Sequence, residues 1–232
     1  MIKENINGYT VLAKDCGEKY IDVFKDVLSY NFRVEKVFRN IDDTKVLLID
    51  TDYGKYVLKF FAPKDKLLER FLKAMVRGDN YERLFRYTEK ARKNGFKKLN
   101  DFYLLAESKI LRYSKHYIML IEYIEGTDLS SMTKVSNEIK EEVKESIVEL
   151  HENDIVSGDA HKGNFILQGD EVRLIDLSGK RASSQRRAKD FLDLKRHYGI
   201  DIPKECKNIG YYFLMFRRKF RKFTHLIKGK KK

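Results

Sequence analysis

The feature that most constrains this chain is a short polar loop that runs directly into a β-hairpin. The loop spans Ser157 to Asn164, and two apolar arms follow it between Phe165 and Ile175, on either side of a Gly169-Asp170 turn. Reflection about that turn pairs residue 164 with residue 175, because hairpin strands are antiparallel. Asn164 and Asp176 should therefore leave the open end of the hairpin side by side.

The residue types at this open end favour a metal-assisted phosphotransfer site. A side-chain carbonyl and a carboxylate are hard oxygen ligands of the kind that Mg²⁺ prefers. Asp159 lies five residues before Asn164 and can reach the same place, where it could orient a hydroxyl nucleophile or accept its proton. A single Asp in a loop is usually a turn or cap residue. The spacing of Asp159, Asn164 and Asp176 around one hairpin indicates catalysis instead.

These residues resemble the catalytic segment of the protein kinase-like fold. In that fold a catalytic Asp precedes a metal-binding Asn by five residues, and a second metal-binding Asp follows a hairpin. The resemblance implies that Asp159 is catalytic and that Asn164 and Asp176 bind Mg²⁺. Gly158-Asp159-x-His161-x-x-Asn164 is similar to the small-molecule branch, which includes aminoglycoside, choline and lipopolysaccharide sugar kinases. Leu177-Ser178 stands where protein kinases have Phe-Gly, so the acceptor should be a sugar or small hydroxyl compound.

The hydrophobic pattern predicts strands with one helical region, followed by a mainly helical half. Together with the resemblance, this order implies an α+β, two-lobed protein kinase-like fold with a small antiparallel β lobe and a mainly helical lobe. The predicted strands are Val34 to Arg39, Lys45 to Asp50, Lys55 to Phe61, Phe102 to Ala106 and Tyr117 to Ile124. Helical spacing covers Lys66 to Lys93, with a break at Gly78-Asp79, and a second helix contains Ile139, Val143, Ile147 and Leu150 after a Ser136 N-cap. We expect a β-rich ATP-binding lobe at residues 1–124, a helical catalytic lobe at 125–212 and a basic amphipathic tail at 213–232.

Upstream residues fit an ATP site of the same kind. Lys59 lies on the third predicted strand among apolar neighbours, where a lysine needs an anion such as the ATP phosphates. Its helix partner should be Glu82, with Glu69 as the weaker alternative. The resemblance further implies that Ile121 flanks the adenine and that the backbones of Glu122 and Ile124 bond it. A Gly-rich loop is missing, because the first hairpin turn is Asn40-Ile41-Asp42-Asp43.

The net charge of +13 predicts an anionic partner, but the charge is concentrated at one end. Arg217 to Lys232 holds nine Lys and Arg and no acid, which leaves +4 for all preceding residues. Phe213, Phe216, Phe220, Phe223 and Ile227 recur there at helical spacing. This stripe suits either a last helix packed on the core or an interfacial anchor on anionic lipid. A second basic group either binds anionic parts of the substrate or forms a solvated face, and it comprises Lys180, Arg181, Arg186, Arg187 and Lys189.

The sequence as a whole is similar to the bacterial lipopolysaccharide core heptose(II) kinases. The resemblance is carried by Asn40 to Lys45, Asp50 to Lys55, Ser157 to Asp159 and Asp176 to Arg181. It implies transfer of the ATP γ-phosphate to a hydroxyl of the second heptose of the inner core, on a lipopolysaccharide core–lipid A acceptor. The resemblance also implies that the reaction takes place at the cytoplasmic face of the inner membrane. Neither a transmembrane run nor a signal peptide is visible, which predicts the cytoplasm.

Three alternatives remain open at this point. The first is a related sugar kinase with another acceptor. The second is a basic nucleic-acid-binding protein, against which the absence of a stacking motif and the terminal position of the charge both argue. The third is a pseudokinase, which retention of Lys59, Asp159, Asn164 and Asp176 disfavours.

Overall fold

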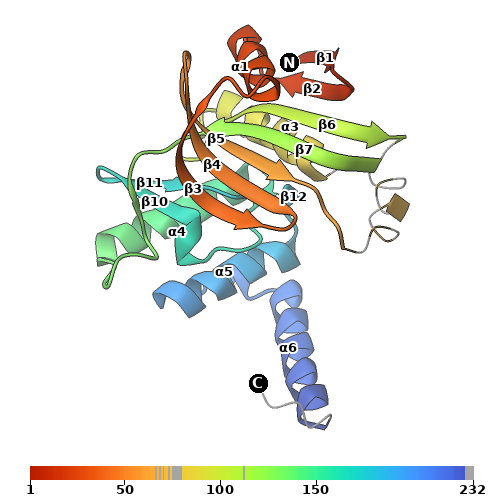
Figure 1. Ribbon diagram of the computed structural model, residues 1–232. Helices are drawn as coiled ribbons and strands as arrows, with labels where there is room; N and C mark the ends of the chain where they lie inside the picture. The colour runs from red at the N-terminus through yellow and green to blue at the C-terminus, as the bar shows by residue number, and fades with distance from the viewer. Residues whose placement is uncertain are drawn as a thin grey trace. The chain divides into compact units, whose positions relative to one another are not determined.

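The computed structural model describes residues 1–65, 67, 69, 71, 72, 74, 80–111 and 113–227. The predicted break at Gly78-Asp79 and the run from Lys228 to Lys232 lie outside these residues. The chain divides into two compact units, Met1–Glu125 and Gly126–Lys232. Each unit is built around its own sheet and helices (Figure 1).

Unit 1 is built on a seven-stranded sheet in which every neighbouring pair of strands is antiparallel. Its strand order is β1-β2-β6-β7-β5-β4-β3. The strands are β1 (Ile2–Ile6), β2 (Tyr9–Ala13), β3 (Arg33–Ile41), β4 (Thr44–Thr51), β5 (Gly54–Phe61), β6 (Phe102–Ile110) and β7 (Tyr113–Glu122). Two helices accompany them, α1 (Glu18–Leu28) and α3 (Asn80–Lys93).

All five predicted strands are confirmed, with different ends for some of them. β6 runs on to Ile110, and β7 begins at Tyr113 and stops at Glu122 rather than Ile124. The sequence pattern missed β1, β2 and α1. β1 carries exposed Lys3, Glu4 and Asn5, which give it no apolar alternation, and it exists because it pairs with β2 at the edge of the sheet.

The two faces of the sheet carry different helices. Tyr20 and Phe24 of α1 pack in a core with Leu58 and Leu104. Phe85 of α3 packs in another core with Leu105 and Met119. Leu104 and Leu105 are consecutive on β6 and therefore point to opposite faces. α1 and α3 consequently cover opposite faces of one sheet.

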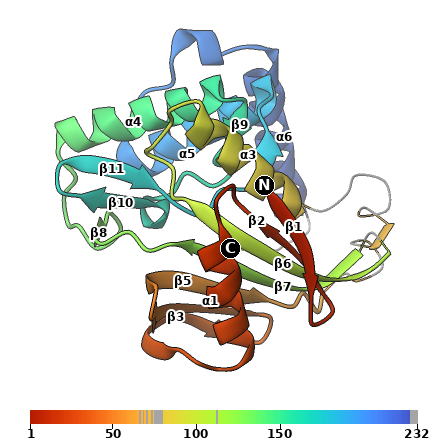
Figure 2. The same cartoon turned by 90° about the horizontal axis from the view of Figure 1, so that it is seen from above.

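Unit 2 is mainly helical. Its helices are α4 (Asn137–Glu152), α5 (Ser184–Tyr198) and α6 (Ile209–Ile227), with short 3₁₀ turns η1 (Lys162–Asn164) and η2 (Lys204–Cys206). Its strands are β8 (Thr127–Asp128), β9 (Ile155–Val156), β10 (Phe165–Gln168), β11 (Glu171–Leu174) and β12 (Lys180–Arg181). Figure 2 shows the β10–β11 hairpin lying along α4.

The α4 helix confirms the predicted cap and apolar stripe. The Ser136 hydroxyl accepts a hydrogen bond from the Ile139 amide at 3.3 Å, which satisfies one of the orphan donors of the first turn. Val143, Ile147 and Leu150 are fully buried. The periodicity therefore identified the face by which α4 joins the core of unit 2.

The α6 helix leaves its aromatic stripe in solvent. Its first residues pack on the start of α5, where a Cβ at Gly210 would come within 2.7 Å of the Gln185 nitrogen. Arg218 Nη2 lies 3.5 Å from Asp193 Oδ1 of α5. Phe213, Phe216, Phe220 and Phe223 are nevertheless all more than half exposed. The alternative in which this stripe packs on the core is wrong for these four residues.

Among the described residues, no helix combines the length and hydropathy needed to cross a bilayer.

Phe85→Ala should lower the free energy of unfolding by about 4 kcal/mol, because it empties a fully buried aromatic site between α3 and the sheet. Urea denaturation followed by circular dichroism measures this change. Phe216→Ala, at a side chain that is 68% exposed, is the matched control and should change stability by less than about 0.5 kcal/mol. Equal losses in the two variants would contradict the assigned core.

Candidate active site

The loop before the hairpin is organised around Asn164. The buried Asn164 side chain donates from Nδ2 to the backbone oxygen of Asp159 at 2.8 Å. This bond fixes the amide so that its carbonyl oxygen, Oδ1, is the atom left for a cation. The Asp159 carboxylate itself is exposed. The loop thus holds an amide oxygen in place and presents a carboxylate to solvent.

The hairpin brings Asp176 next to Asn164. Phe165 pairs with Leu174, and the Ile175 amide donates to the Asn164 carbonyl at 3.0 Å, as reflection about the Gly169-Asp170 turn requires. Asp176 follows immediately, is exposed and has a φ of +54°, a left-handed conformation that Asp tolerates better than most residues. The predicted juxtaposition of residues 164 and 176 therefore rests on the observed register.

A buried carboxylate beneath the loop holds its backbone. Asp190 of α5 is fully buried and accepts hydrogen bonds from the amides of Ser157 at 2.9 Å and Gly158 at 2.8 Å. His151 Nε2 lies 3.0 Å from the same side chain. A buried carboxylate is tolerable only when its oxygens are satisfied in this way. Asp190 therefore ties α5, α4 and the loop that carries Asp159 together.

Gly158 is required by both conformation and space. Its φ is +80°, and a Cβ there would stand 2.6 Å from Ser178 Oγ. Ser178 in turn donates its amide to Ser157 O at 3.1 Å and its hydroxyl to Val156 O at 3.2 Å. The segment after Asp176 thus packs directly on the segment before Asp159, which leaves no room for a side chain at position 158.

The second basic group is largely occupied by the protein itself. Lys189 bonds Gly158 O and Asp193, Arg187 donates to His151 O, and Arg186 donates to Arg181 O. Arg181 pairs with Asp154. These contacts show that Lys189 and Arg187 bond the loop and α4, while Lys180, Arg181 and Arg186 are exposed. Whether the group binds anionic parts of the substrate or forms a solvated face stays a prediction.

The predicted ATP residues of unit 1 share one face of its sheet. Lys59 pairs in register with Met119, and Val57 pairs with Ile121. Met119 belongs to the core formed with Phe85 of α3. Because cross-strand partners point to the same face, Lys59 and Ile121 lie on the face that α3 covers. Ile121 lies two residues beyond Met119, the partner of Lys59, on the same strand. This spacing fits a nucleotide whose phosphates contact Lys59 and whose base contacts Ile121.

Arg86 and Lys109 are both close to the Glu82 carboxylate. It lies 2.8 Å from Arg86 and 3.4 Å from Lys109. Partial burial opposes the Glu82 charge, but the hydrogen bonds and charges of these two cations outweigh it and lower the pKa of Glu82. Pairing of Lys59 with Glu82, or with the exposed Glu69, stays a prediction.

Glu122 and Ile124 differ in what they offer to a base. The Glu122 amide donates to Asp101 O at 2.9 Å, and its carboxylate accepts from the Asp101 amide at 2.8 Å. Asp101 also pairs with Lys14 at 2.5 Å and with Arg92 at 3.4 Å. An adenine contact at this residue would therefore use the Glu122 carbonyl rather than its N–H. Ile124 follows the strand with its side chain buried.

The donor set at the hairpin fits Mg²⁺ better than a softer metal. Asn164 and Asp176 supply an amide and a carboxylate oxygen, and exposure on one side leaves room for the waters and phosphates that complete a magnesium shell. Within the described residues, no cluster of three or more His, Cys, Asp or Glu is placed to hold a metal.

Nearly the whole chain matches one protein family. Residues 1–230 match the family described as "Lipopolysaccharide core biosynthesis protein (WaaY)". The chain belongs to this family. Two curated relatives agree with it, and both are named lipopolysaccharide core heptose(II) kinase WaaY. The one from Escherichia coli strain K12 is 54% identical over 98% of this chain and 97% of its own. The other, from Escherichia coli, is 50% identical over 96% of each chain.

A solved structure shows the fold of this WaaY-family chain. The Rio2 kinase from Chaetomium thermophilum, in a complex with ADP, Mg²⁺ and phosphoaspartate, aligns with a TM-score of 0.53. The alignment has 12% sequence identity and covers 84% of this chain and 66% of that one. The predicted α+β, protein kinase-like fold is confirmed.

Sequence reasoning missed Asp190, which supports the loop of this WaaY-family member, and it named Lys189 without its contact with the loop. Both residues stand in a helix whose Ala188, Phe191 and Leu194 are buried. An acid inside an apolar helical stripe is itself a signal, because a buried carboxylate must have partners. The signal does not say which partners, since Ser157 and Gly158 lie more than thirty positions away.

Asp190→Asn should lower the free energy of unfolding by about 3 kcal/mol, because an amide nitrogen replaces one of the two acceptors beneath the loop. Chemical denaturation of the full chain measures the change. Asp201→Asn is the matched control at a side chain that is 91% exposed, and it should cost less than about 1 kcal/mol. A wild-type free energy of unfolding for Asp190→Asn would show that Asp190 does not stabilise the loop.

Proposed function

We propose that this chain is an ATP-dependent kinase that transfers the γ-phosphate to a hydroxyl of the second heptose of the lipopolysaccharide inner core. The arrangement that carries this proposal is the Asn164 amide bound to Asp159 O, with Asp176 following the residue paired to Asn164. Membership of the WaaY family and the names of its curated relatives support the acceptor.

Asp159 is the residue that would act on the acceptor. Its exposed carboxylate can accept a hydrogen bond from the heptose hydroxyl and orient the oxygen for in-line attack. His161 Nε2 lies 3.7 Å from Asp159 Oδ2, and His161 Nδ1 accepts from the Gly163 amide at 3.0 Å. This second bond holds the imidazole in place, so His161 limits where the Asp159 carboxylate can go.

Asn164 and Asp176 would hold Mg²⁺, and Lys59 would hold the triphosphate. Bound Mg²⁺ would neutralise charge that develops on the transferred phosphoryl group. Lys59 projects from the α3 face of the sheet, where a fixed cation can pair with phosphate oxygens. Ile121 would flank the adenine, with Glu122 and Ile124 contributing backbone groups and Glu82 the predicted partner of Lys59.

Asp159→Asn and Asp176→Asn should each reduce phosphate transfer at least about a hundredfold while the circular dichroism spectrum stays unchanged. Cells that lack the gene are complemented with each variant, and mass spectrometry of their lipopolysaccharide core counts phosphates on the second heptose. Asp170→Asn, in the exposed hairpin turn, is the matched control and should restore the phosphate fully. Full phosphorylation with Asp159→Asn would refute the assignment.

We further propose that α6 brings the enzyme to an anionic membrane surface. The aromatic stripe of α6 is exposed, and Arg217, Lys219 and Arg221 beside it are exposed as well. Aromatic rings at the acyl boundary and cations at the headgroups bind such a surface together. A core–lipid A acceptor is anchored in a bilayer, so its kinase would act as a peripheral protein on the cytoplasmic face of the inner membrane.

Phe216→Ser/Phe220→Ser should lower binding to vesicles of phosphatidylglycerol and phosphatidylethanolamine at least about tenfold, because two rings no longer enter the interface. Arg217→Gln/Arg221→Gln should weaken binding and flatten its salt dependence. Vesicle sedimentation measures both effects. Tyr30→Ser/Phe38→Ser, which removes two exposed aromatic residues of unit 1, is the control and should bind as wild type. Wild-type binding by both α6 variants would exclude α6 as the anchor.

A further inference from the structure

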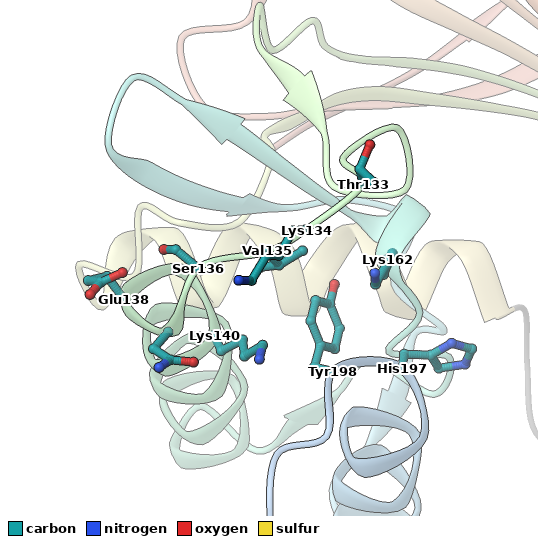
Figure 3. Close-up of a pocket in the computed structure, with 10 residues that line it drawn as sticks. Thr133, Lys134, Val135, Ser136, Glu138, Lys140, Lys162, His197 and Tyr198 are labelled. Atoms are coloured by element: carbon teal, nitrogen blue, oxygen red, sulfur yellow. The ribbon is translucent and has the colours of Figure 1, made fainter.

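A hollow in unit 2 lies outside the residues assigned to phosphate transfer. Its volume is about 630 Å³, within the range of small-molecule pockets. It is formed by the segment before α4, the first turn of α4, η1 and the end of α5 (Figure 3). Lys134, Lys140, Lys162 and His197 line it, and Glu138 is the only acid among its described lining residues. The hollow is therefore predominantly cationic.

Tyr198 supplies an independent sign of a ligand. The residue is only 5% exposed, and its hydroxyl has no hydrogen-bond partner among the described residues. Figure 3 shows the ring rising from α5 with its hydroxyl directed between Val135 and Lys162. Burial, with a contribution from the Asp128 charge, raises the pKa of Tyr198, so the hydroxyl keeps its proton at neutral pH. A buried donor without a partner calls for an acceptor atom from elsewhere.

The first turn of α4 adds to the positive potential. α4 is 16 residues long, and its N-terminus at Asn137 borders the hollow. The amides of a first helical turn point outward and carry partial positive charge, which favours an anion beside them. One of these amides, that of Ile139, already donates to Ser136 Oγ, and Glu138 carries a negative charge in the same turn. The lysine side chains and the Tyr198 hydroxyl therefore carry the argument, and both suit an oxyanion.

The hollow borders the loop that carries Asp159. Lys162 stands between Asp159 and Asn164 in the sequence and contributes to the lining. The His197 ring lies 6.4 Å from the His161 ring, and His161 Nε2 is 3.7 Å from Asp159 Oδ2. A molecule held in the hollow would therefore lie close to the carboxylate that acts on the acceptor.

We propose that this hollow is an acceptor subsite that binds an anionic group, a phosphate or a carboxylate, carried by the acceptor beside the sugar that is phosphorylated. This inference rests on the proposed function and adds a specificity site to it. Lys134, Lys140 and Lys162 neutralise the group, and the Tyr198 hydroxyl donates to one of its oxygens. The subsite orients the neighbouring sugar hydroxyl toward Asp159 and rejects neutral acceptors.

Kinetic measurements on lipopolysaccharide from cells that lack the gene test the acceptor role. Lys140→Gln should raise the KM for this acceptor about tenfold and leave the KM for ATP within about twofold of wild type. Lys144→Gln is the matched control, because Lys144 lies on the same helix outside the hollow and pairs with Glu141. Equal acceptor KM values for the two variants would overturn the proposal.

Tyr198→Phe separates ligand binding from a structural role. Removal of a hydroxyl that has no partner in the described part of the chain should leave thermal stability unchanged or raise it, whereas the acceptor KM should rise about threefold or more. A hydroxyl that served only the fold would show the reverse, a loss of stability with a wild-type KM. That second result would overturn the proposal.

Direct anion binding distinguishes failure of the subsite from failure of the proposed function. Titration of the full chain with inorganic phosphate and with acetate, followed calorimetrically, should show binding that Lys134→Gln/Lys140→Gln weakens and Lys144→Gln does not. The tighter of the two anions identifies the group. If wild-type protein phosphorylates no lipopolysaccharide but shows this pattern, the function fails and the anion site stands. If neither anion binds, or all variants bind alike, the subsite fails whatever the activity.

Discussion

The site depends above all on one buried carboxylate. Asp190 accepts hydrogen bonds from two backbone amides of the loop before Asp159 and contacts His151, so one side chain joins α5, α4 and the proposed catalytic loop. The loop needs this support because it contains Gly158 in a left-handed conformation and a carboxylate that must stay exposed. Lys189 and Ser178 add contacts on either side of the same glycine. These contacts hold the loop backbone in place while the Asp159 carboxylate stays exposed, as a preorganised site requires.

Both units place their predicted site residues through antiparallel strand register. In unit 1 an antiparallel sheet fixes Lys59 and Ile121 on one face through strand register, and α3 covers that face with Phe85. In unit 2 the β10–β11 hairpin fixes Asn164 next to Asp176 by the same kind of register. The cations of unit 2 divide into two sets. Lys189 and Arg187 bond backbone oxygens at and near the loop, whereas Lys134, Lys140 and Lys162 line the hollow in which the Tyr198 hydroxyl has no partner among the described residues.

Much of this arrangement could be predicted because it depends on local order. The hairpin around Gly169-Asp170, the Ser136 cap and the strands that carry Lys59 and Ile121 follow from turn chemistry and periodicity. The β1–β2 hairpin and α1 could not be found in this way, because β1 has no apolar alternation and is stabilised by pairing with its neighbour. The contacts of Asp190 with Ser157 and Gly158 could not be predicted either, because the residues around Asp190 do not indicate a partner more than thirty positions away.

The sequence by itself determined which side chains can take part in chemistry. Asp159, Asn164 and Asp176 stand at spacings that a hairpin brings together. Hairpin register depends on a turn and the residues next to it, so it can be predicted from the sequence. Only the tertiary structure decided how each charge is used. It placed Arg187 and Lys189 in contact with the segments around the loop, left the α6 aromatic residues in solvent, and buried the Tyr198 hydroxyl with no hydrogen-bond partner among the described residues. Those outcomes depend on contacts between segments distant in the chain, and residue type alone does not specify such contacts.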